Sequence, residues 1–274
     1  MSGLTKTKIE YGEFSWNFFP GCEHWRTGVC PVAERCWAKR EAHQHRRSFE
    51  PHLRPELLLA PLHVRKPSTI LVNFTGDLGG DWIDPALDIG KQDIPITLKA
   101  ETAFYHSNRN LSRTIFDVVT VCPQHQFFFL TKNPLAWQKW GRWPENAWVG
   151  VSICEDVMLT KAYQPLKNTQ AKHKWLSIEP LLGWGMSVAD MAWTLKSVGI
   201  SFVVIGCETG LGARPCKIEW IESIVRACDE AGVKVWLKNK TKPLIEQAGM
   251  GKGRWAAKEW VQCKYPILRQ ELPE

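Results

Sequence analysis

Three cysteines near the amino terminus have the residue type and spacing to hold a metal centre. Cys22, Cys30 and Cys36 lie in one short segment that directly follows an apolar run expected to form a strand. Three thiolates on one loop can ligate three irons of a four-iron cluster and leave the fourth iron open. They can also supply most of a tetrahedral zinc site, with His24 as the fourth ligand. A third interpretation is that they are ordinary buried thiols, because free cysteine packs as a small apolar residue.

The composition favours metal ligation over disulfide bonding. The chain has nine cysteines, an odd number, and shows neither an N-terminal signal peptide nor an apolar run long enough to span a membrane. We therefore expect a cytoplasmic protein with reduced thiols and no membrane partner. Clustered cysteines in such a protein indicate metal binding or catalysis.

Short apolar runs alternate with helical segments along the chain. With 274 residues, 44% of them hydrophobic, the chain can bury a core of barrel size. We expect one domain over residues 1–274, with a barrel core at 1–242 and a C-terminal extension at 243–274. The expected strands are Phe14–Phe19, Thr69–Phe74, Gln126–Leu130, Ala147–Val151, Lys174–Ser177, Phe202–Ile205 and Lys234–Leu237. The expected helices are Val32–His45, Asp84–Ala100 continuing through Ser112–Val119, Leu135–Trp140, Val157–Leu166, Val188–Val198 and Trp220–Ala231.

The strands are apolar on both faces and separated by crossover segments, which is typical of buried parallel strands. This pattern predicts an α/β fold, a full or partial (β/α) TIM-like barrel with a short C-terminal cap, in preference to a doubly wound open sheet.

Polar residues follow the expected strands at the end where a barrel places its active site. We expect them to surround one pocket, although each alone can equally be a helix cap or a turn former. The cofactor-binding candidates are Asn73, Thr75, Gly76, Asp77, Ser152, Glu179, Gly206 and Glu208. The catalytic candidates are Glu179, Glu208, Lys132 and Lys238. Such a set meets the demand of a radical cluster site, where the open iron takes the amino and carboxylate groups of S-adenosylmethionine and nearby groups position them.

The surface is expected to attract polyanions. The chain carries a formal net charge of +7 and 15 tryptophans, whose flat rings can stack on bases. The densest basic run, Lys39–Arg54, directly follows the cysteine segment. Excess Lys and Arg also simply solvate a surface, so the position of this run is what favours a nucleic-acid partner.

At this point the sequence resembles the phage-associated three-Cys-motif proteins, described as radical-SAM-like phage proteins of unknown function. The matching segments are Lys8-Ile-Glu10, Ser15-Trp-Asn17, Gly21-Cys22, Cys36-Trp-Ala-Lys-Arg40, Val72-Asn73, Asp77-Leu78, Leu130-Thr-Lys132, Gly150-Val-Ser152, Ser177-Ile-Glu-Pro-Leu-Leu-Gly183, Gly206-Cys-Glu-Thr-Gly210, Ala213-Arg-Pro215 and Ala231-Gly232 through Lys238. The sequence departs from the family in two places. The family has a Cys-x-x-Cys pair followed by Tyr, whereas five residues separate Cys30 from Cys36 here and Trp37 takes the aromatic place. A double glycine of the family is Gly206-Cys207 here.

The resemblance implies a barrel with a [4Fe-4S] cluster that cleaves S-adenosylmethionine and abstracts hydrogen from a substrate, in a bacterium or a phage-infected host cell. Cys22, Cys30 and Cys36 would be the ligands. The substrate hypothesis is a nucleobase, nucleotide or nucleic acid, and a separate partner protein is left open. The alternative is a zinc-stabilised module that binds nucleic acid or protein without redox chemistry. A hydrolase using Asp77, Glu179 and Glu208 is less favoured, because the sequence has no HExxH motif.

Overall fold

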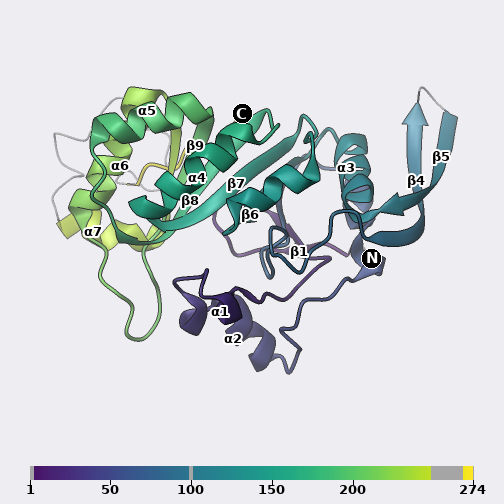
Figure 1. The fold of residues 1–274 in the computed structure, drawn as a ribbon, viewed down its shortest axis with the longest axis horizontal. Helices are drawn as coiled ribbons and strands as arrows, with labels where there is room; N and C mark the ends of the chain where they lie inside the picture. The colour runs from purple at the N-terminus through teal and green to yellow at the C-terminus, as the bar shows by residue number, and fades with distance from the viewer. Residues whose placement is uncertain (1–2, 99–100, 248–267, 274) are drawn as a thin grey trace. The chain divides into compact units, whose positions relative to one another are not determined.

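The computed structural model describes residues 3–98, 101–247 and 268–273, and these fall into two compact units (Figure 1). The described residues up to Val149, with Thr169–Lys172, form the first unit. Gly150–Asn168 and the described residues from His173 onward form the second. Strand β7 (Ala147–Glu155) passes from the first unit into the second. Because the two units share this strand, the division does not test the expected single domain over residues 1–274, which stays a prediction.

The main sheet is mostly parallel, as the apolar runs indicated. Its remaining strands are β1 (Thr5–Lys6), β2 (Phe14–Trp16), β3 (Thr69–Val72), β6 (Gln126–Thr131), β8 (His173–Gly183), β9 (Ile200–Ile205) and β10 (Lys234–Leu237). In the first unit β2 pairs in parallel with β3 and β3 with β6, while the short β1 is antiparallel to β2. In the second unit β8, β9 and β10 are parallel neighbours. All seven expected strands are therefore confirmed.

The sheet is open. Its hydrogen-bonded order is β1-β2-β3-β6-β7-β8-β9-β10, so within the described residues it begins at β1 and ends at β10 without a pairing that closes it. The expectation of a full barrel is thus wrong, whereas an α/β fold with a largely parallel sheet is confirmed. Within the described residues β1, at one edge, is antiparallel to β2, and β10, at the other edge, pairs with β9 and with the chain at Gln270.

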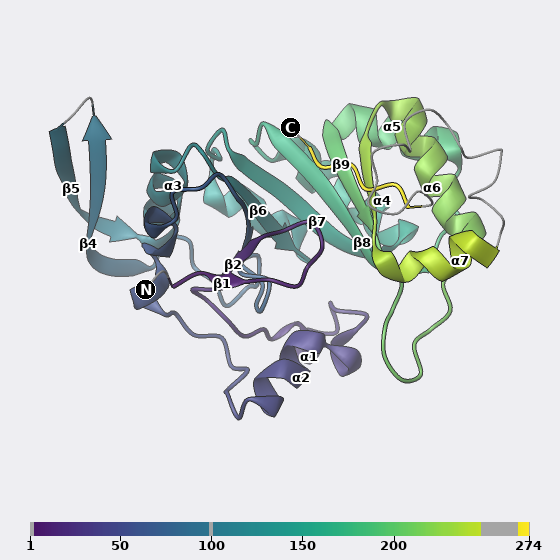
Figure 2. The same ribbon diagram turned by 180° about the vertical axis from the view of Figure 1, so that it is seen from behind.

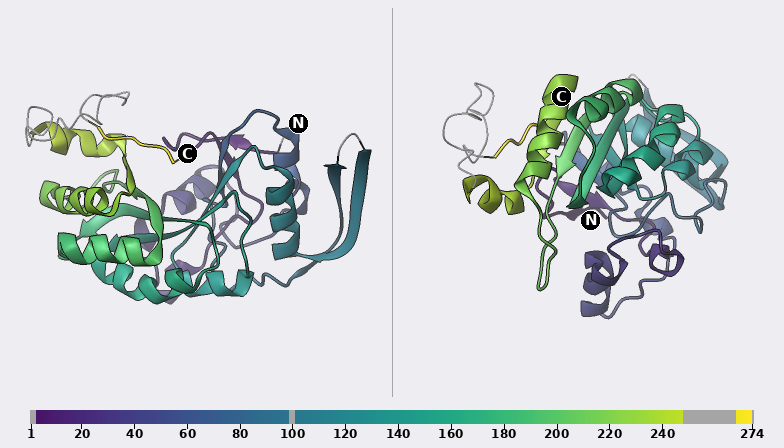
Figure 3. Two further views of the ribbon diagram at one scale, coloured as in Figure 1. Left: turned by 90° about the horizontal axis from the view of Figure 1, so that it is seen from above. Right: turned by 60° about the vertical axis from the view of Figure 1, so that its left-hand side comes forward.

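The helices follow the strands as crossovers. They are α1 (His24–Thr27), α2 (Trp37–Gln44), α3 (Leu111–Val121), α4 (Asp156–Asn168), α5 (Val188–Val198), α6 (Ile218–Ala231) and α7 (Lys242–Gln247). Short 3-10 turns add η1 (Ala33–Arg35), η2 (Pro55–Leu57), η3 (Ala60–His63), η4 (Pro134–Trp140) and η5 (Asn239–Thr241). In the second unit α5 and α6 lie side by side (Figure 3). Helix α6 ends at Gly232, whose left-handed φ of 71° is the conformation that glycine adopts without steric cost.

The predicted helix Asp84–Ala100 is wrong as far as the structure describes it. Residues Asp88–Leu98 form strand β4, which pairs with β5 (Glu101–Asn110) in a hairpin of its own beside α3 (Figure 1). Pro95 lacks the N–H that a helix interior requires, and Gly90 takes a φ of +73°. The last two residues of the predicted helix lie outside the described residues. Its expected continuation exists as α3.

Each unit has its own apolar core. In the first unit Trp16, Phe127 and Phe129 of the sheet pack with Ile115 of α3 and Trp137 of η4. In the second, side chains of β8 and β9 pack against α5 and α6, with Leu176, Val203 and Ile224 fully buried. Within the described residues no helix is long and apolar enough to cross a membrane.

The edge strand β10 is covered by the chain terminus. Leu237 N donates to Arg269 O at 2.8 Å and Glu271 N donates to Val235 O at 3.0 Å, so the returning chain pairs with β10 (Figure 2). Arg269 is buried and forms ion pairs with Asp229 and Glu271. A covered edge cannot pair with another chain. The rest of the predicted C-terminal extension, residues 248–267, lies outside the described residues.

Lys174, at the start of β8, joins the ends of two helices. Its Nζ donates to Leu166 O at 2.7 Å and to Lys167 O at 3.4 Å, both at the end of α4, and to Val198 O of α5 at 3.4 Å. Burial lowers the pKa of this ammonium, and the carbonyls of the helix ends compensate its charge.

We expect Lys174→Met to destabilise the protein by about 1–3 kcal/mol, because buried carbonyls lose their donor. Urea unfolding monitored by circular dichroism measures this. Lys172→Met is the matched control, since Lys172 is exposed and pairs with exposed Glu145, and such pairs contribute about 0–1 kcal/mol. Equal stability of both variants would contradict the assigned role of Lys174.

Candidate metal centre and strand-end clusters

The cysteine loop, residues 21–36, extends from the end of β2 to the start of α2. The one-turn helix α1 follows Cys22 and ends at Gly28, whose φ of 69° is left-handed. Cys30 lies in the next turn, where its carbonyl accepts from Ala33 N at 3.2 Å. Cys36 is the residue that begins α2, with an extended ψ of 115°. The loop thus turns twice and brings its three cysteines back to one region of the first unit.

The three thiols act on one another electrostatically. Burial is the main cause that raises the pKa of Cys22 to about 12, and the negative charges of Asp77, Cys36 and Cys30 raise it further. Burial also raises the pKa of Cys30, with Cys36 and Asp77 adding to the effect, while the Lys132 ammonium opposes it. Ionised acidic groups crowded in this way repel each other, and a bound cation removes that repulsion.

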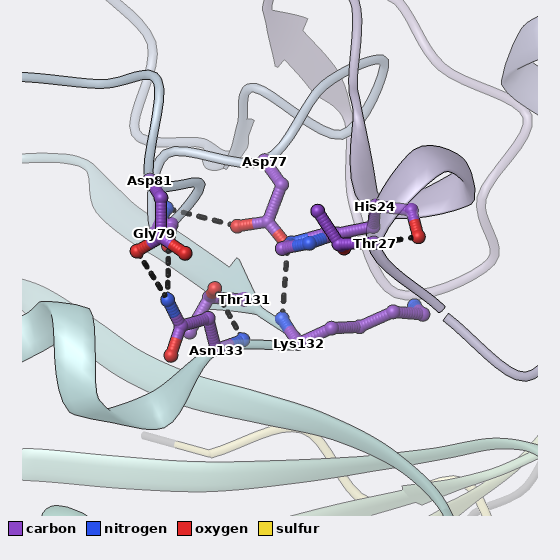
Figure 4. Close-up of polar contacts among 8 residues, drawn as sticks. All are labelled: His24, Thr27, Asp77, Gly79, Asp81, Thr131, Lys132 and Asn133. Atoms are coloured by element: carbon purple, nitrogen blue, oxygen red, sulfur yellow. Dashed lines mark hydrogen bonds and ion pairs between the residues drawn. The ribbon is translucent and has the colours of Figure 1, made fainter. Parts of the chain in front are cut away.

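Asp77 is the buried anchor of this region (Figure 4). His24 Nε2 donates to Asp77 Oδ2 at 2.8 Å, and the backbone N–H of Lys132 donates to the same oxygen at 2.9 Å. Gly79 N donates to Oδ1 at 2.8 Å. Burial alone would raise the pKa of the Asp77 carboxyl, but the hydrogen bond and charge of His24, with donors from Lys132 and Thr131, lower it below its ordinary value. Asp77 is therefore held as a carboxylate.

The predicted residues around Asp77 hold the backbone of the cysteine loop. Both amide atoms of Asn73 bond the backbone of Phe19, at 2.9 Å to its N–H and 2.7 Å to its oxygen. Gly21 N donates to Thr75 O at 3.1 Å, and Gly21 and Gly76 form a parallel bridge. A Cβ on Gly76 would lie 2.5 Å from Phe19 O, so this close approach requires glycine. The segment after β3 thereby fixes the backbone position of Gly21, the residue before Cys22.

The donor set consists of sulfur ligands, which both an iron-sulfur cluster and zinc accept. Among the described residues no three His, Cys, Asp or Glu side chains are arranged to hold one metal ion, as the zinc alternative with His24 requires. His24 is buried and its Nε2 is engaged by Asp77. Cluster ligands bind separate irons and do not converge on one point. Three neighbouring thiols are the number of protein ligands that a cluster with one open iron would need.

Glu179 and Lys238 are brought together in the second unit. The Lys238 ammonium and the Glu179 carboxylate form a direct ion pair, with 19% and 29% of their side chains exposed. Gly206 lies against both, because a Cβ there would be 3.0 Å from Lys238 Cδ and 3.1 Å from Glu179 Cδ. Three predicted residues from the ends of β8, β9 and β10 therefore form one cluster. Ser152, in β7, is buried.

The loop of residues 206–217 between β9 and α6 extends from the second unit as a long finger (Figure 1). Glu208 accepts from Arg214 at three donors: the backbone N at 2.7 Å, Nε at 3.0 Å and a terminal nitrogen at 2.6 Å. The Glu208 side chain is 6% exposed and is committed to closing this loop. Arg214 was not among the predicted site residues, although it lies in the Ala213-Arg-Pro215 segment. A carboxylate and an arginine six residues apart across a Gly-rich turn were the available signal.

The 206–217 loop also contains a pair of interacting thiols, Cys207 and Cys216. The hydrogen bond from Cys216 lowers the pKa of Cys207, and the same bond together with burial raises the pKa of Cys216. Cys207 therefore accepts a hydrogen bond from Cys216.

Comparisons with known proteins place the sequence and the fold. Residues 96–257 match the model of a family described as protein of unknown function (DUF5131). No curated protein matches the chain. Among solved structures the chain is similar to a spore photoproduct lyase complexed with dinucleoside spore photoproduct, with 9% identity and a TM-score of 0.50. The similarity covers 87% of this chain and 80% of that one. At this identity it shows a shared fold.

We expect Gly76→Ala to destabilise the protein by about 1–3 kcal/mol, because the new methyl group overlaps the backbone of Phe19 and Gly21. Thermal unfolding by calorimetry measures the change. Gly183→Ala is the control, since its Cβ would meet Glu155 Cγ at an ordinary 3.5 Å. A Gly76→Ala protein as stable as the control would show that Gly76 does not approach the backbone of Phe19 as closely as described.

We expect iodoacetamide at pH 7.5 to alkylate Cys207 faster than Cys122 or Cys228, whose pKa values burial raises. Peptide-resolved mass spectrometry follows the rates in apoprotein. Cys216→Ala slows the labelling of Cys207, because the thiolate loses its hydrogen bond, whereas Cys122→Ala leaves it unchanged. Unaltered labelling in Cys216→Ala contradicts the assigned hydrogen bond.

Proposed function

We propose a function from the site itself, because the chain belongs to a family of proteins of unknown function (DUF5131), whose description assigns no activity. The proposed function is that of an iron-sulfur enzyme that uses S-adenosylmethionine to abstract hydrogen from a nucleic acid or nucleotide. The observation that supports the proposal is that Cys22, Cys30 and Cys36 lie on one loop, near enough together for the charge of Cys36 to act on both Cys22 and Cys30. The resemblance of the sequence to radical-SAM-like proteins also supports this proposal.

Three thiolates from one loop would hold three irons of a [4Fe-4S] cluster and leave one iron without a protein ligand. A reduced cluster held there would supply the electron for reductive cleavage of S-adenosylmethionine, the chemistry by which such enzymes abstract hydrogen. The chain's own contribution is the loop geometry. Asp77 holds His24, two residues from Cys22, and Gly76 fixes the backbone where the loop begins.

The predicted cationic and acidic residues have separate tasks in this proposal. The backbone N–H of Lys132 holds Asp77, while its ammonium is close enough to Cys30 to oppose the rise that burial causes in the pKa of that thiol. In the second unit the Glu179–Lys238 pair offers one acceptor and one donor at the strand ends, which suits a zwitterion or a ribose. Glu208 contributes by shaping the 206–217 loop through Arg214.

The proposed substrate class rests on two observations. The structure with the similar fold is a lyase in complex with a dinucleoside photoproduct. The chain has a net charge of +7, which attracts polyanions. A nucleic acid or nucleotide combines the anionic backbone with the ribose and base groups that such a site can bind.

Anaerobic purification with iron, sulfide and zinc analysis tests the proposal. We expect a brown protein with about four irons and four sulfides per chain. Cys22→Ala, Cys30→Ala and Cys36→Ala each lose most of this iron, because each removes one of three ligands. With dithionite as the electron donor, the loaded protein converts S-adenosylmethionine to methionine and 5′-deoxyadenosine.

Cys122→Ala is the matched control. Cys122 is buried in the core of the first unit, and this variant keeps all three loop thiols. Its iron content stays at the wild-type level. One zinc per chain without iron, or wild-type iron in all three loop variants, would falsify the proposal.

A further inference from the structure

The α1–α2 surface of the first unit, formed by the exposed parts of Trp25, Trp37, Arg40, Arg46 and Arg47, combines rings with cations. Helices α1 and α2 are neighbours (Figures 1 and 2), since Lys39 Nζ of α2 lies 4.1 Å from the centre of the Trp25 ring of α1. Trp25 is 40% exposed and Trp37 is 47% exposed. Large aromatic side chains are normally covered, so an exposed ring in a segment with exposed cations indicates a partner.

The charge of this surface is strongly positive. Residues 25–54 contain seven Lys and Arg against three Glu, which accounts for more than half of the net charge of the chain. Arg26 pairs with Glu23 and Glu50 at 2.7 and 2.8 Å. In the described part of the chain, Arg40, Arg46 and Arg47 form no ion pair. Three cations are thus available to an anionic partner.

Arg46 adopts a strained backbone conformation. Its φ of 53° is left-handed, and the bonds from Arg46 N to His43 O and from Arg47 N to Ala42 O complete a helix-end motif in which glycine is the usual residue. A non-glycine residue there costs stability. Strain retained at an exposed arginine indicates that the side chain has a use.

The two tryptophans are not equivalent. Lys39 Nζ lies 4.1 Å and Arg26 Cζ 4.7 Å from the Trp25 ring centre, so this ring already carries two cations. Trp37 has no ring or cation partner among the described residues. Trp37 is therefore the ring that can stack on a ligand.

We propose that the α1–α2 surface binds single-stranded nucleic acid, with Trp37 stacking on an unpaired base and Arg40, Arg46 and Arg47 contacting the phosphates on either side. Stacking rings beside backbone-tracking cations are the standard means of binding single strands. A membrane surface fits less well, because an interfacial helix needs an apolar face. The exposed positions of α2 carry one apolar ring among Arg40, Glu41, His43 and Gln44.

The inference deepens the proposed function by giving its nucleic-acid substrate a docking surface, and it does not depend on the cluster. Fluorescence anisotropy of the full chain with a labelled twelve-nucleotide oligo-dT tests it. We expect Trp37→Ala to weaken binding about tenfold, in line with the loss of one stacked base. Arg40→Ala and Arg47→Ala each lower the slope of log affinity against log salt by about 0.7.

Arg46→Gly separates binding from folding. Glycine relieves the left-handed strain, so the thermal midpoint rises while oligonucleotide affinity falls. Trp193→Ala is the matched ring control, because Trp193 is 61% exposed but stacks on Tyr163 at 5.5 Å. Its affinity stays at the wild-type value. Replacing Trp37 lowers the affinity for an abasic oligonucleotide less than the affinity for oligo-dT, because the abasic strand has no base to stack on the ring.

Wild-type affinity in both Trp37→Ala and Arg46→Gly overturns the inference, whatever the iron content. Binding to anionic phosphatidylserine vesicles but not to oligo-dT also overturns it. Loss of affinity in these variants, with no iron and no S-adenosylmethionine cleavage in the wild type, leaves this surface standing and removes the proposed chemistry.

Discussion

The buried carboxylate of Asp77 is the constraint on which the metal-centre region depends. A charge removed from water is costly unless donors replace its hydration, and Asp77 receives donors from His24, Lys132 and Gly79. These residues come from the cysteine loop, the tip after β6 and its own tip after β3. Satisfying one carboxylate therefore fixes three segments that lie more than fifty residues apart. Removing one partner of such a buried pair generally costs about 3–5 kcal/mol.

Patterns that depend on local chemistry predicted much of the fold. The apolar runs predicted every main parallel strand, and the Gly232 stop predicted the end of α6, because burial and helix ends leave a direct trace in residue type. The β4–β5 hairpin was missed, because a helix was expected over Asp84–Ala100, and the two strands pair with each other and not with the main sheet. Barrel closure could not be predicted either. Closure depends on how the strands at the two ends of a sheet are placed, and no residue pattern encodes that.

The candidate site was predictable in residue types and not in partnerships. Asp77 and Lys132 were expected to meet a ligand, yet Asp77 holds the protein's own backbone and Lys132 contributes through its N–H as well as its ammonium. Glu208 was expected in a pocket and is bound by Arg214. A sequence shows which groups are capable of a hydrogen bond, whereas the choice between an internal partner and a ligand is made by distances of a few ångströms. Gly76 is the exception, because close approach allows no other residue and glycine itself is the signal.

The electrostatics of the cysteine loop and of its surroundings have opposite signs. Inside, burial raises the pKa of Cys22 to about 12, with smaller contributions from Asp77 and the neighbouring thiols, so the Cys22 thiol holds its proton tightly. Outside, the cations of the α1–α2 surface follow immediately in the chain. A cation bound by the thiols displaces their protons, while a polyanion neutralises the outer cations. The two proposed ligands therefore act on different groups, and neither requires the other to be present, which is why cluster loading and nucleic-acid binding can be measured independently on the same chain.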